Sequence, residues 1–218
     1  SAANPTAAAQ RSRTHRIAVT AMLSAAATVL MFLEFPIPFL IPSFVELDFS
    51  ELPALLAAFS LGPASGVVVC LVKNVIKGLL FSGTGGVGEM CNFLLGICLV
   101  IPAGLIYRYK KTRSGALLGA LAGAVIMAVC SVPLNYFVSY PVYTKFLPID
   151  VIISMYQEII QSFNGLLSRA GAPFSLPSVN GLLGCLIAFN APFTLLKGLL
   201  DTALCFLIYK PLSPLLHR

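Results

Sequence analysis

Nine of the fourteen basic residues of this chain fall in three short clusters that separate long apolar stretches, and this sorting constrains the fold more than any single motif. Basic residues that flank membrane spans stay in the cytoplasm. All three clusters are therefore expected on the inner side of a membrane, with most acidic residues on the outer side. The clusters are Arg11, Arg13 and Arg16; Arg108, Lys110, Lys111 and Arg113; and Lys210 with Arg218.

Composition places the chain among integral membrane proteins. Hydrophobic residues make up 58% of its 218 residues, charged residues only 10%, and the mean hydropathy is +0.91, far from the average soluble domain. We expect an all-α, multi-pass protein of the cell membrane, with six transmembrane helices and both termini in the cytoplasm. The membrane domain is expected over residues 16–218, after a disordered tail at 1–15. The net charge of +6 belongs to the inner face and does not suggest nucleic acid.

The apolar runs predict where the chain crosses the bilayer, because a crossing helix needs about 20 apolar residues. Gly62-Pro63 interrupts a run that is too long for one helix and divides it into a short helix and a longer one. The outer segment 140–179 contains, at 152–167, the apolar spacing of an amphipathic helix lying over the outer mouth. The expected crossing segments are residues 16–35, 51–82 as two helices, 87–109, 115–137 and 180–209.

Charged side chains inside the spans need a partner or a function, because each costs at least about 2.5 kcal/mol at the bilayer centre. The candidates are Lys73, Lys77, Glu89, Lys197 and Asp201. Lys73 and Glu89 flank a glycine-rich turn, and an ion pair between them is expected. Lys197 has Asp201 one helical turn later as a local partner. A local pair or snorkelling is one interpretation of Lys197, and contact with a buried ligand is the other.

Polar and aromatic side chains gather at the expected outer ends of the spans. Asn135 offers both a donor and an acceptor, and Tyr140 fits either a ligand site or an interfacial aromatic belt. The loop from Phe44 to Phe49 brings rings and a carboxylate to the same mouth. The stretch that begins at Asp48 fits an ordinary helix N-cap equally well.

The sequence offers little support for catalysis. Gly83 to Gly88 matches G-x-G-x-x-G but lacks a preceding strand, so a turn is expected, and no G-x-x-x-x-G-K-[ST] phosphate loop is present. The two histidines stand near the chain ends, and the six cysteines occur singly without the spacing of a metal site or a disulfide framework. The chain is not expected to be an enzyme. A membrane enzyme using Lys73 and Glu89 is the less favoured alternative.

Small residues mark one face on each of two expected spans. Ala21 and Ala25 would let another helix approach the first span closely, and both a partner subunit and internal packing fit this pattern. Gly115, Gly119 and Gly123 repeat the pattern in a later span, where internal packing is expected.

An ordered set of segments resembles the riboflavin-binding S components of energy-coupling factor (ECF) transporters. Each segment alone is a weak signal, but the ordered set is specific, and it extends over about residues 16–215. The segments are Glu34-Phe-Pro-Ile-Pro38, Asp48-Phe-Ser-Glu-Leu-Pro-Ala-Leu55, Leu61-Gly-Pro63, Lys73-Asn74, Thr84-Gly-Gly-Val-Gly-Glu89, Asn92-Phe93, Pro102-Ala-Gly-Leu-Ile-Tyr107, Asn135-Tyr-Phe137, Leu196-Lys-Gly198 and Tyr209.

The resemblance implies a six-helix membrane subunit that binds riboflavin near the outer surface and has no ATPase of its own. Such a subunit works with a transmembrane coupling subunit and two cytoplasmic ATPases. The face of Ala21 and Ala25 matches the small-residue motif that packs on the coupling subunit. The resemblance implies ligand contacts at Leu47, Asp48, Asn135 and Lys197.

One position departs from the family pattern. Thr194 stands where the family has asparagine, and Asn190, one turn earlier, is a further candidate contact. Riboflavin is expected as the transported ligand, without a cofactor or a metal, and an S component for thiamine, biotin or pantothenate is the nearest alternative. The expected ligand-binding set is Phe44, Leu47, Asp48, Phe49, Asn135, Tyr140, Asn190, Thr194 and Lys197.

Overall fold

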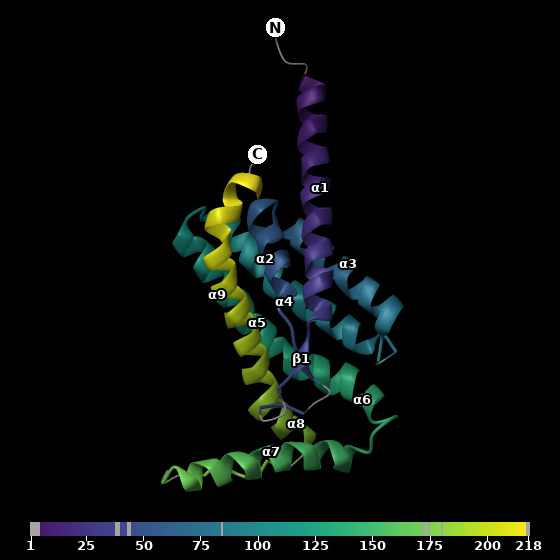
Figure 1. Ribbon diagram of the computed structural model, residues 1–218, viewed down its shortest axis with the longest axis vertical. Helices are drawn as coiled ribbons and strands as arrows, with labels where there is room; N and C mark the ends of the chain where they lie inside the picture. Colours follow the sequence, from purple (N-terminus) through teal and green to yellow (C-terminus); the bar gives the residue numbers. More distant parts are fainter. Residues whose placement is uncertain are drawn as a thin grey trace.

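The chain folds into a bundle of helices with one helix lying across one end (Figure 1). The first turns of α1 and the last turns of α9 both lie at the opposite end. The computed structural model describes residues 5–37, 40–42, 45–83, 85–171, 173, 175–179 and 181–216.

Helices account for nearly all of the regular structure in the described ranges. Two of the long helical segments are each interrupted by a π-helical stretch, named η1 and η2. The elements are α1 (Pro5–Phe32), β1 (Phe35–Pro36), β2 (Glu46–Leu47), α2 (Glu51–Ser60), α3 (Pro63–Phe81), α4 (Val87–Tyr109), α5 (Arg113–Leu134), η1 (Asn135–Ser139), α6 (Tyr140–Tyr143), α7 (Ile149–Arg169), α8 (Leu182–Cys185), η2 (Leu186–Asn190) and α9 (Ala191–Leu216).

Five helical segments among the described residues are long and apolar enough to cross a membrane. The sequence predicts six spans, and the additional one corresponds to α2, which has 10 residues. At about 1.5 Å per residue, α2 covers roughly half of a 30 Å hydrocarbon layer. The crossing segments are Ser12–Phe32, Pro63–Phe81, Val87–Tyr109, Arg113–Tyr143 and Leu182–Ile208.

Several predicted boundaries are confirmed. The break between α2 and α3 falls at Gly62, whose φ of 103° suits glycine, and Pro63 occupies the first turn of α3. The helix predicted over 87–109 is α4 with those bounds. The glycine-rich segment before it is a turn, with positive φ at Gly85 and Gly86.

The N-terminal prediction differs from the structure. A disordered tail is predicted up to residue 15, whereas α1 already begins at Pro5. The stretch that follows Pro5 is rich in alanine, the residue with the highest helix propensity, so the helix extends toward the N-terminus beyond its membrane-spanning part.

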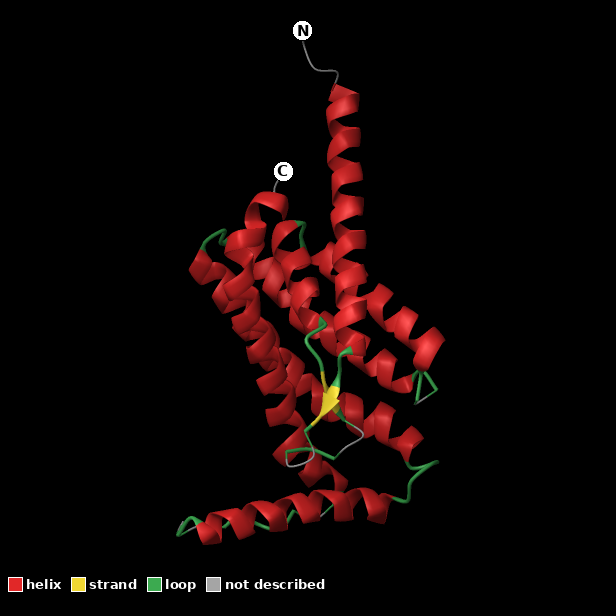
Figure 2. Cartoon of the chain, in the orientation of Figure 1, coloured by secondary structure: helices red, strands yellow, loops and turns green. Residues whose placement is uncertain are grey.

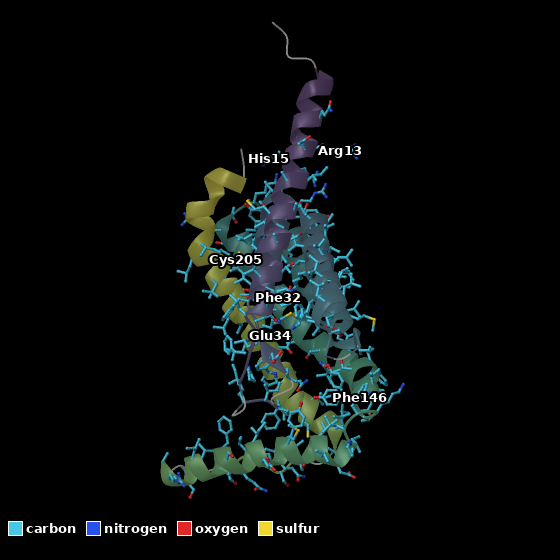
Figure 3. All side chains as sticks on the ribbon, turned by 45° about the vertical axis from the view of Figure 1, so that its right-hand side comes forward. Arg13, His15, Phe32, Glu34, Phe146 and Cys205 are labelled. Atoms are coloured by element: carbon cyan, nitrogen blue, oxygen red, sulfur yellow. The ribbon has the colours of Figure 1, made fainter. Side chains whose placement is uncertain are left out.

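The predicted amphipathic helix is α7, which lies across the end of the bundle away from the chain termini (Figure 1). Its buried side chains are Ile152, Tyr156, Ile159 and Ile160, so one stripe of α7 faces the bundle. Phe146 lies near this end, whereas Arg13 lies near the other (Figure 3).

A short antiparallel hairpin follows α1, toward the α7 end of the bundle (Figure 2). Phe35 in β1 pairs with Leu47 in β2, and Pro36 pairs with Glu46. The hairpin fixes the loop between α1 and α2, and it therefore holds Asp48, which follows β2, close to the helix ends.

The helices α4 and α5 approach closely through glycine. A Cβ atom at Gly119 would lie 2.7 Å from the carbonyl oxygen of Ala103, and one at Gly123 would overlap the carbonyl oxygen of Leu99. The prediction that these glycines serve internal packing is confirmed.

We predict that Gly123→Ala lowers the free energy of unfolding by about 1 to 3 kcal/mol, because its methyl group would force the two backbones apart. Gly165→Ala is the matched control, since nothing lies within 4 Å of that position on α7. The control is expected to be neutral or stabilising by up to about 1 kcal/mol. Thermal unfolding in detergent measures both. Equal melting of Gly123→Ala and the parent would contradict the assigned helix contact.

Candidate functional site

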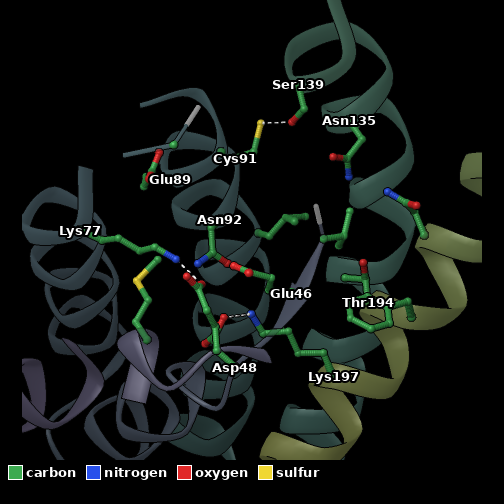
Figure 4. Close-up of a pocket in the computed structure, with 18 of the residues that line it drawn as sticks. Glu46, Asp48, Lys77, Glu89, Cys91, Asn92, Asn135, Ser139, Thr194 and Lys197 are labelled. Atoms are coloured by element: carbon green, nitrogen blue, oxygen red, sulfur yellow. Dashed lines mark hydrogen bonds and ion pairs between the residues drawn. The ribbon is translucent and has the colours of Figure 1, made fainter. Parts of the chain in front are cut away.

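A cavity of about 460 Å³ opens at the α7 end of the bundle, between the hairpin and the ends of several helices. This size is in the range of sites for small organic ligands. Its wall combines apolar side chains with polar groups from parts of the chain that are far apart in the sequence (Figure 4). The polar groups include Asp48, Asn92, Asn135, Asn190, Thr194 and Lys197.

Five of the nine residues expected to bind ligand line this cavity. They are Asp48, Asn135, Asn190, Thr194 and Lys197. Asp48 follows β2, Asn135 begins η1, Asn190 ends η2, and the last two belong to α9. The fold thus brings together side chains that are far apart in the sequence.

The other four residues do not lie in the described lining. Leu47 is buried in a small apolar cluster with Ile41 and Phe193. Phe49 packs on Phe35, with 6.3 Å between ring centroids. Phe44 lies outside the described residues.

Tyr140 is also turned away from the cavity. Its side chain is 1% exposed, and its hydroxyl lies 2.6 Å from the hydroxyl of Tyr156 on α7. An interfacial belt needs rings at the lipid surface, so the belt interpretation of Tyr140 is wrong.

The central polar contact joins Lys197 to Asp48. The Lys197 Nζ donates to Asp48 Oδ2 at 2.8 Å, and both side chains are largely buried. The interpretation of Lys197 as a local pair with Asp201 is wrong, because the loop after the hairpin places the Asp48 carboxylate against it. Asp201 is fully buried, and neither of its carboxylate oxygens has a hydrogen-bond partner among the described residues.

Asp48 also organises the start of α2. Its Oδ1 accepts the backbone N–H of Ser50 at 2.8 Å and the Ser50 hydroxyl. The N-cap residue of α2 is Ser50, and its side chain makes no cap hydrogen bond. Asp48 lies two residues before this position, so it is not the N-cap itself. Burial would raise the pKa of Asp48, but the charges of Lys197 and Lys73, with these hydrogen bonds, hold it well below its ordinary value. Asp48 is therefore a carboxylate at neutral pH.

A second buried ion pair lies beside the first. Lys73 donates to Glu51 Oε1 at 2.6 Å and also to the Ser50 hydroxyl. The expected Lys73–Glu89 pair is wrong, because α2 places Glu51 against α3, whereas Glu89 accepts a hydrogen bond from Ser82 at 3.1 Å. Through Ser50, the two ion pairs form one connected polar network.

Charged groups also stand in the cavity wall near the end of α1. Lys77 pairs with Glu34, and Glu46 lies beside them (Figure 4). Partial burial raises the pKa of Glu46, and a hydrogen bond and the negative charge from Glu34 raise it further. This part of the wall carries more negative than positive groups.

The remaining walls are suited to a flat, largely apolar molecule. Met31, Phe81, Leu95, Met127 and Phe193 supply hydrocarbon, sulfur and ring surfaces. A polar group at one end and apolar surfaces along the sides would fix the orientation of a ring system.

The side-chain carboxamide of Asn135 has a fixed orientation in the cavity wall. Its Nδ2 donates to the backbone oxygen of Ser131 at 2.8 Å, which orients the carboxamide. The π-helical turn that begins at Asn135 widens the helix locally, and such turns occur often at functional sites.

The ligand-site prediction missed several wall residues, among them Glu34, Glu46, Lys77, Asn92 and Tyr143. The charge of Lys77 inside a span was the available signal, because an intramembrane charge marks a functional site by default. No local pattern singles out Tyr143, whose place in the wall depends on how η1 turns.

The chain matches a protein family described as "ECF transporter, substrate-specific component" over residues 15–209. It is 34% identical over 204 residues to the riboflavin transporter RibU of Staphylococcus aureus (strain TCH60), covering 93% of each chain. It is 28% identical over 205 residues to the riboflavin transporter FmnP of Bacillus subtilis (strain 168), covering 93% of this chain and 94% of that protein.

The fold also matches a solved structure of the S component of a bacterial ECF transporter. The TM-score is 0.68 at 32% sequence identity, and the match covers 94% of this chain and 99% of that one. Agreement in sequence and in fold extends over almost the whole described chain. The chain therefore belongs to the family of substrate-specific components of ECF transporters, which are membrane-embedded transport subunits and not enzymes.

Proposed function

We propose that this protein is the riboflavin-binding subunit of an ECF-type importer. The observation that carries the proposal is the cavity in which the Asp48–Lys197 pair, Asn135 and Asn190 meet apolar walls. The naming of its relatives as riboflavin transporters supports the same ligand.

Riboflavin fits the chemistry of this cavity. Its ring system is flat and largely apolar, and one edge carries carbonyl oxygens and an imide N–H. An ammonium group has three N–H donors, and among the described residues Lys197 donates one hydrogen bond, to Asp48. Lys197 therefore retains donors for a ring carbonyl, while the Asp48 carboxylate keeps its ammonium group in place.

We place the cavity at the extracellular side, in a topology of six membrane helices with both termini in the cytoplasm. In this arrangement α2 is the second, short helix. The Arg16 guanidinium donates to the carbonyl oxygen of Leu61 at 3.0 Å, which supports an inner location for the α2–α3 break beside the N-terminal basic cluster. The α7 helix then covers the outer end.

The importer would also need partners that supply energy. The sequence contains no phosphate loop for ATP hydrolysis, so a transmembrane coupling subunit and two cytoplasmic ATPases would drive delivery. Ala21 and Ala25 lie on the exposed face of α1, where a helix of the coupling subunit could pack closely.

Beside this exposed face, the hydroxyl groups of α1 are bonded within the helix; Thr20 is partly exposed, whereas Ser24 and Thr28 are buried against the rest of the protein. Thr20 donates to the Arg16 carbonyl at 2.7 Å, and Ser24 and Thr28 each donate to the carbonyl four residues earlier at 2.8 Å. The proposed docking helix therefore carries its polar groups already paired.

The purified protein is expected to bind one riboflavin per chain and to quench its fluorescence. Contact with aromatic side chains such as Phe193 and Tyr143 in a site with little water supports this outcome. The sequence contains no tryptophan, so flavin emission reports binding without interference. Titrations with thiamine, biotin and pantothenate serve as controls. Binding of one of these vitamins instead of riboflavin would overturn the proposed ligand.

Substitutions at the polar end should weaken riboflavin binding. Asn135→Ala is expected to cost about 1 to 3 kcal/mol, because a buried ligand group loses its partner, and Lys197→Met a similar or larger amount. Thr194→Asn is expected to tighten binding. Lys110→Met, at an exposed position outside the cavity, is the matched control. Parental affinity in folded Asn135→Ala and Lys197→Met proteins would refute the site.

Bulky residues on the exposed face of α1 should separate binding from transport. Ala21→Trp or Ala25→Trp should retain riboflavin binding but lose both co-purification with the coupling subunit and ATP-dependent uptake. Ala203→Trp, exposed on α9, is the control for a large ring at another surface. Uptake at the parental rate would exclude this face as the docking surface, and loss of riboflavin binding would assign the alanines to internal packing.

A further inference from the structure

Three buried side chains connect α7 to the wall of the cavity. Tyr140 comes from the start of α6, Tyr156 from the middle of α7 and Asn190 from the end of η2. Their exposed fractions are 1%, 0% and 3%. Ile152, Cys185 and Leu186 surround the tyrosines with apolar atoms, so hydrogen bonds among the three polar groups are shielded from water and strengthened.

The hydrogen bonds in this group run in one direction. The Tyr156 hydroxyl donates to Asn190 Oδ1 at 2.6 Å. A tyrosine hydroxyl has one proton, so Tyr140 must be the donor in its 2.6 Å contact with Tyr156. Burial, followed by the neighbouring Tyr140, raises the pKa of Tyr156 far above its ordinary value. Tyr156 therefore keeps the proton that it donates.

The same group fixes which way the Asn190 carboxamide faces. With its oxygen held by Tyr156, its amino group is the part left for other contacts. An amide nitrogen has two N–H donors, and Asn190 lies in the cavity wall, where a ligand can accept from them.

Asn190 lines the cavity, whereas Tyr140 and Tyr156 do not belong to its lining. An unrestrained carboxamide could rotate and offer either its oxygen or its nitrogen to a ligand. The hydrogen bond from Tyr156 to Oδ1 fixes the orientation of the carboxamide. We propose that Tyr140 and Tyr156 are positioning residues that hold Asn190 as a hydrogen-bond donor toward the cavity, so that this wall selects a ligand with an acceptor atom there.

This inference rests on the proposed function, because it assigns a role to one wall of the riboflavin cavity. Riboflavin has suitable acceptors in its ring carbonyls, its unprotonated ring nitrogens and its ribityl hydroxyls. A molecule that presented only an N–H or an apolar edge at this wall would leave the amino group of Asn190 without a partner, which costs affinity.

The donor assignment is tested at Asn190 itself by measuring riboflavin affinity. Asn190→Asp keeps the shape and can still accept from Tyr156, but a carboxylate cannot donate. Asn190→Leu removes both functions. If Asn190 donates, both variants should bind at least about 10-fold more weakly, the loss of one buried hydrogen bond. Parental affinity in Asn190→Asp would overturn the proposal.

A double-mutant cycle tests whether the tyrosines act through Asn190. Tyr156→Phe should weaken riboflavin binding about 10-fold in the parent, but less than about 2-fold when Asn190 is already leucine, since the residue that it positions is gone. Tyr107→Phe is the control, because this half-buried ring packs on Phe59 with 5.3 Å between centroids and does not line the cavity. Equal effects of Tyr156→Phe in both backgrounds would show that Tyr156 only supports the fold.

A second variant covers the case in which Tyr156→Phe does not fold, as judged by gel filtration and thermal unfolding. Tyr140→Phe leaves the bond from Tyr156 to Asn190 intact, so a smaller loss of about 3-fold is expected, again only when Asn190 is present. A cycle that is additive in a parent that binds riboflavin would refute this inference alone. A parent that binds no riboflavin would refute the proposed function as well.

Discussion

The buried ion pair between Asp48 and Lys197 connects segments of this structure that are far apart in the sequence. It connects the loop after the hairpin to the second turn of α9, and through Ser50 it continues into the pair formed by Lys73 and Glu51. Buried charges lose their hydration, and that loss is offset only when geometry and further hydrogen bonds are favourable. The network meets this condition because each carboxylate accepts from more than one residue: Asp48 from Ser50 and Lys197, and Glu51 from Lys73 and Cys70. The polar end of the cavity is therefore also part of the scaffold, and a change there acts on both.

The membrane elements were largely predictable, because length, apolarity and helix breakers are local properties. The bounds of α4, the break at Gly62 and the amphipathic character of α7 all follow from short stretches of sequence. The close contact at Gly123 was also predictable, since small residues at helical spacing have few other uses. The early start of α1 differs from the predicted tail. The segment is polar, which suggests a tail, but its many alanines favour a helix.

The candidate site was predictable only in part, because its contacts join distant segments. Asn135, Asn190 and Thr194 lie in the cavity wall as expected. The predicted Glu89 partner of Lys73 is wrong, and so is the Asp201 partner that was one of two interpretations of Lys197, because the acidic residue that Lys197 contacts is Asp48, 149 positions away. Neither hydropathy nor helical spacing indicates which residues so far apart in the sequence will be in contact. The same holds for Tyr140, whose hydroxyl contacts Tyr156 on α7.

The exposed face of α1 has a consequence for a helix that must function in two surroundings. After Arg16, the exposed side chains of α1 are apolar, among them Ala21, Ala25 and Val29. Thr20, which is partly exposed, donates to the Arg16 carbonyl within the helix, and Ser24 and Thr28 are buried against the rest of the protein. Hydrocarbon therefore leaves no side-chain donor of this face without a partner, and a protein helix meets a small, apolar surface. Exchanging one environment for the other then costs no hydrogen bonds. Such a surface is compatible with a subunit that leaves and rejoins its complex within the bilayer.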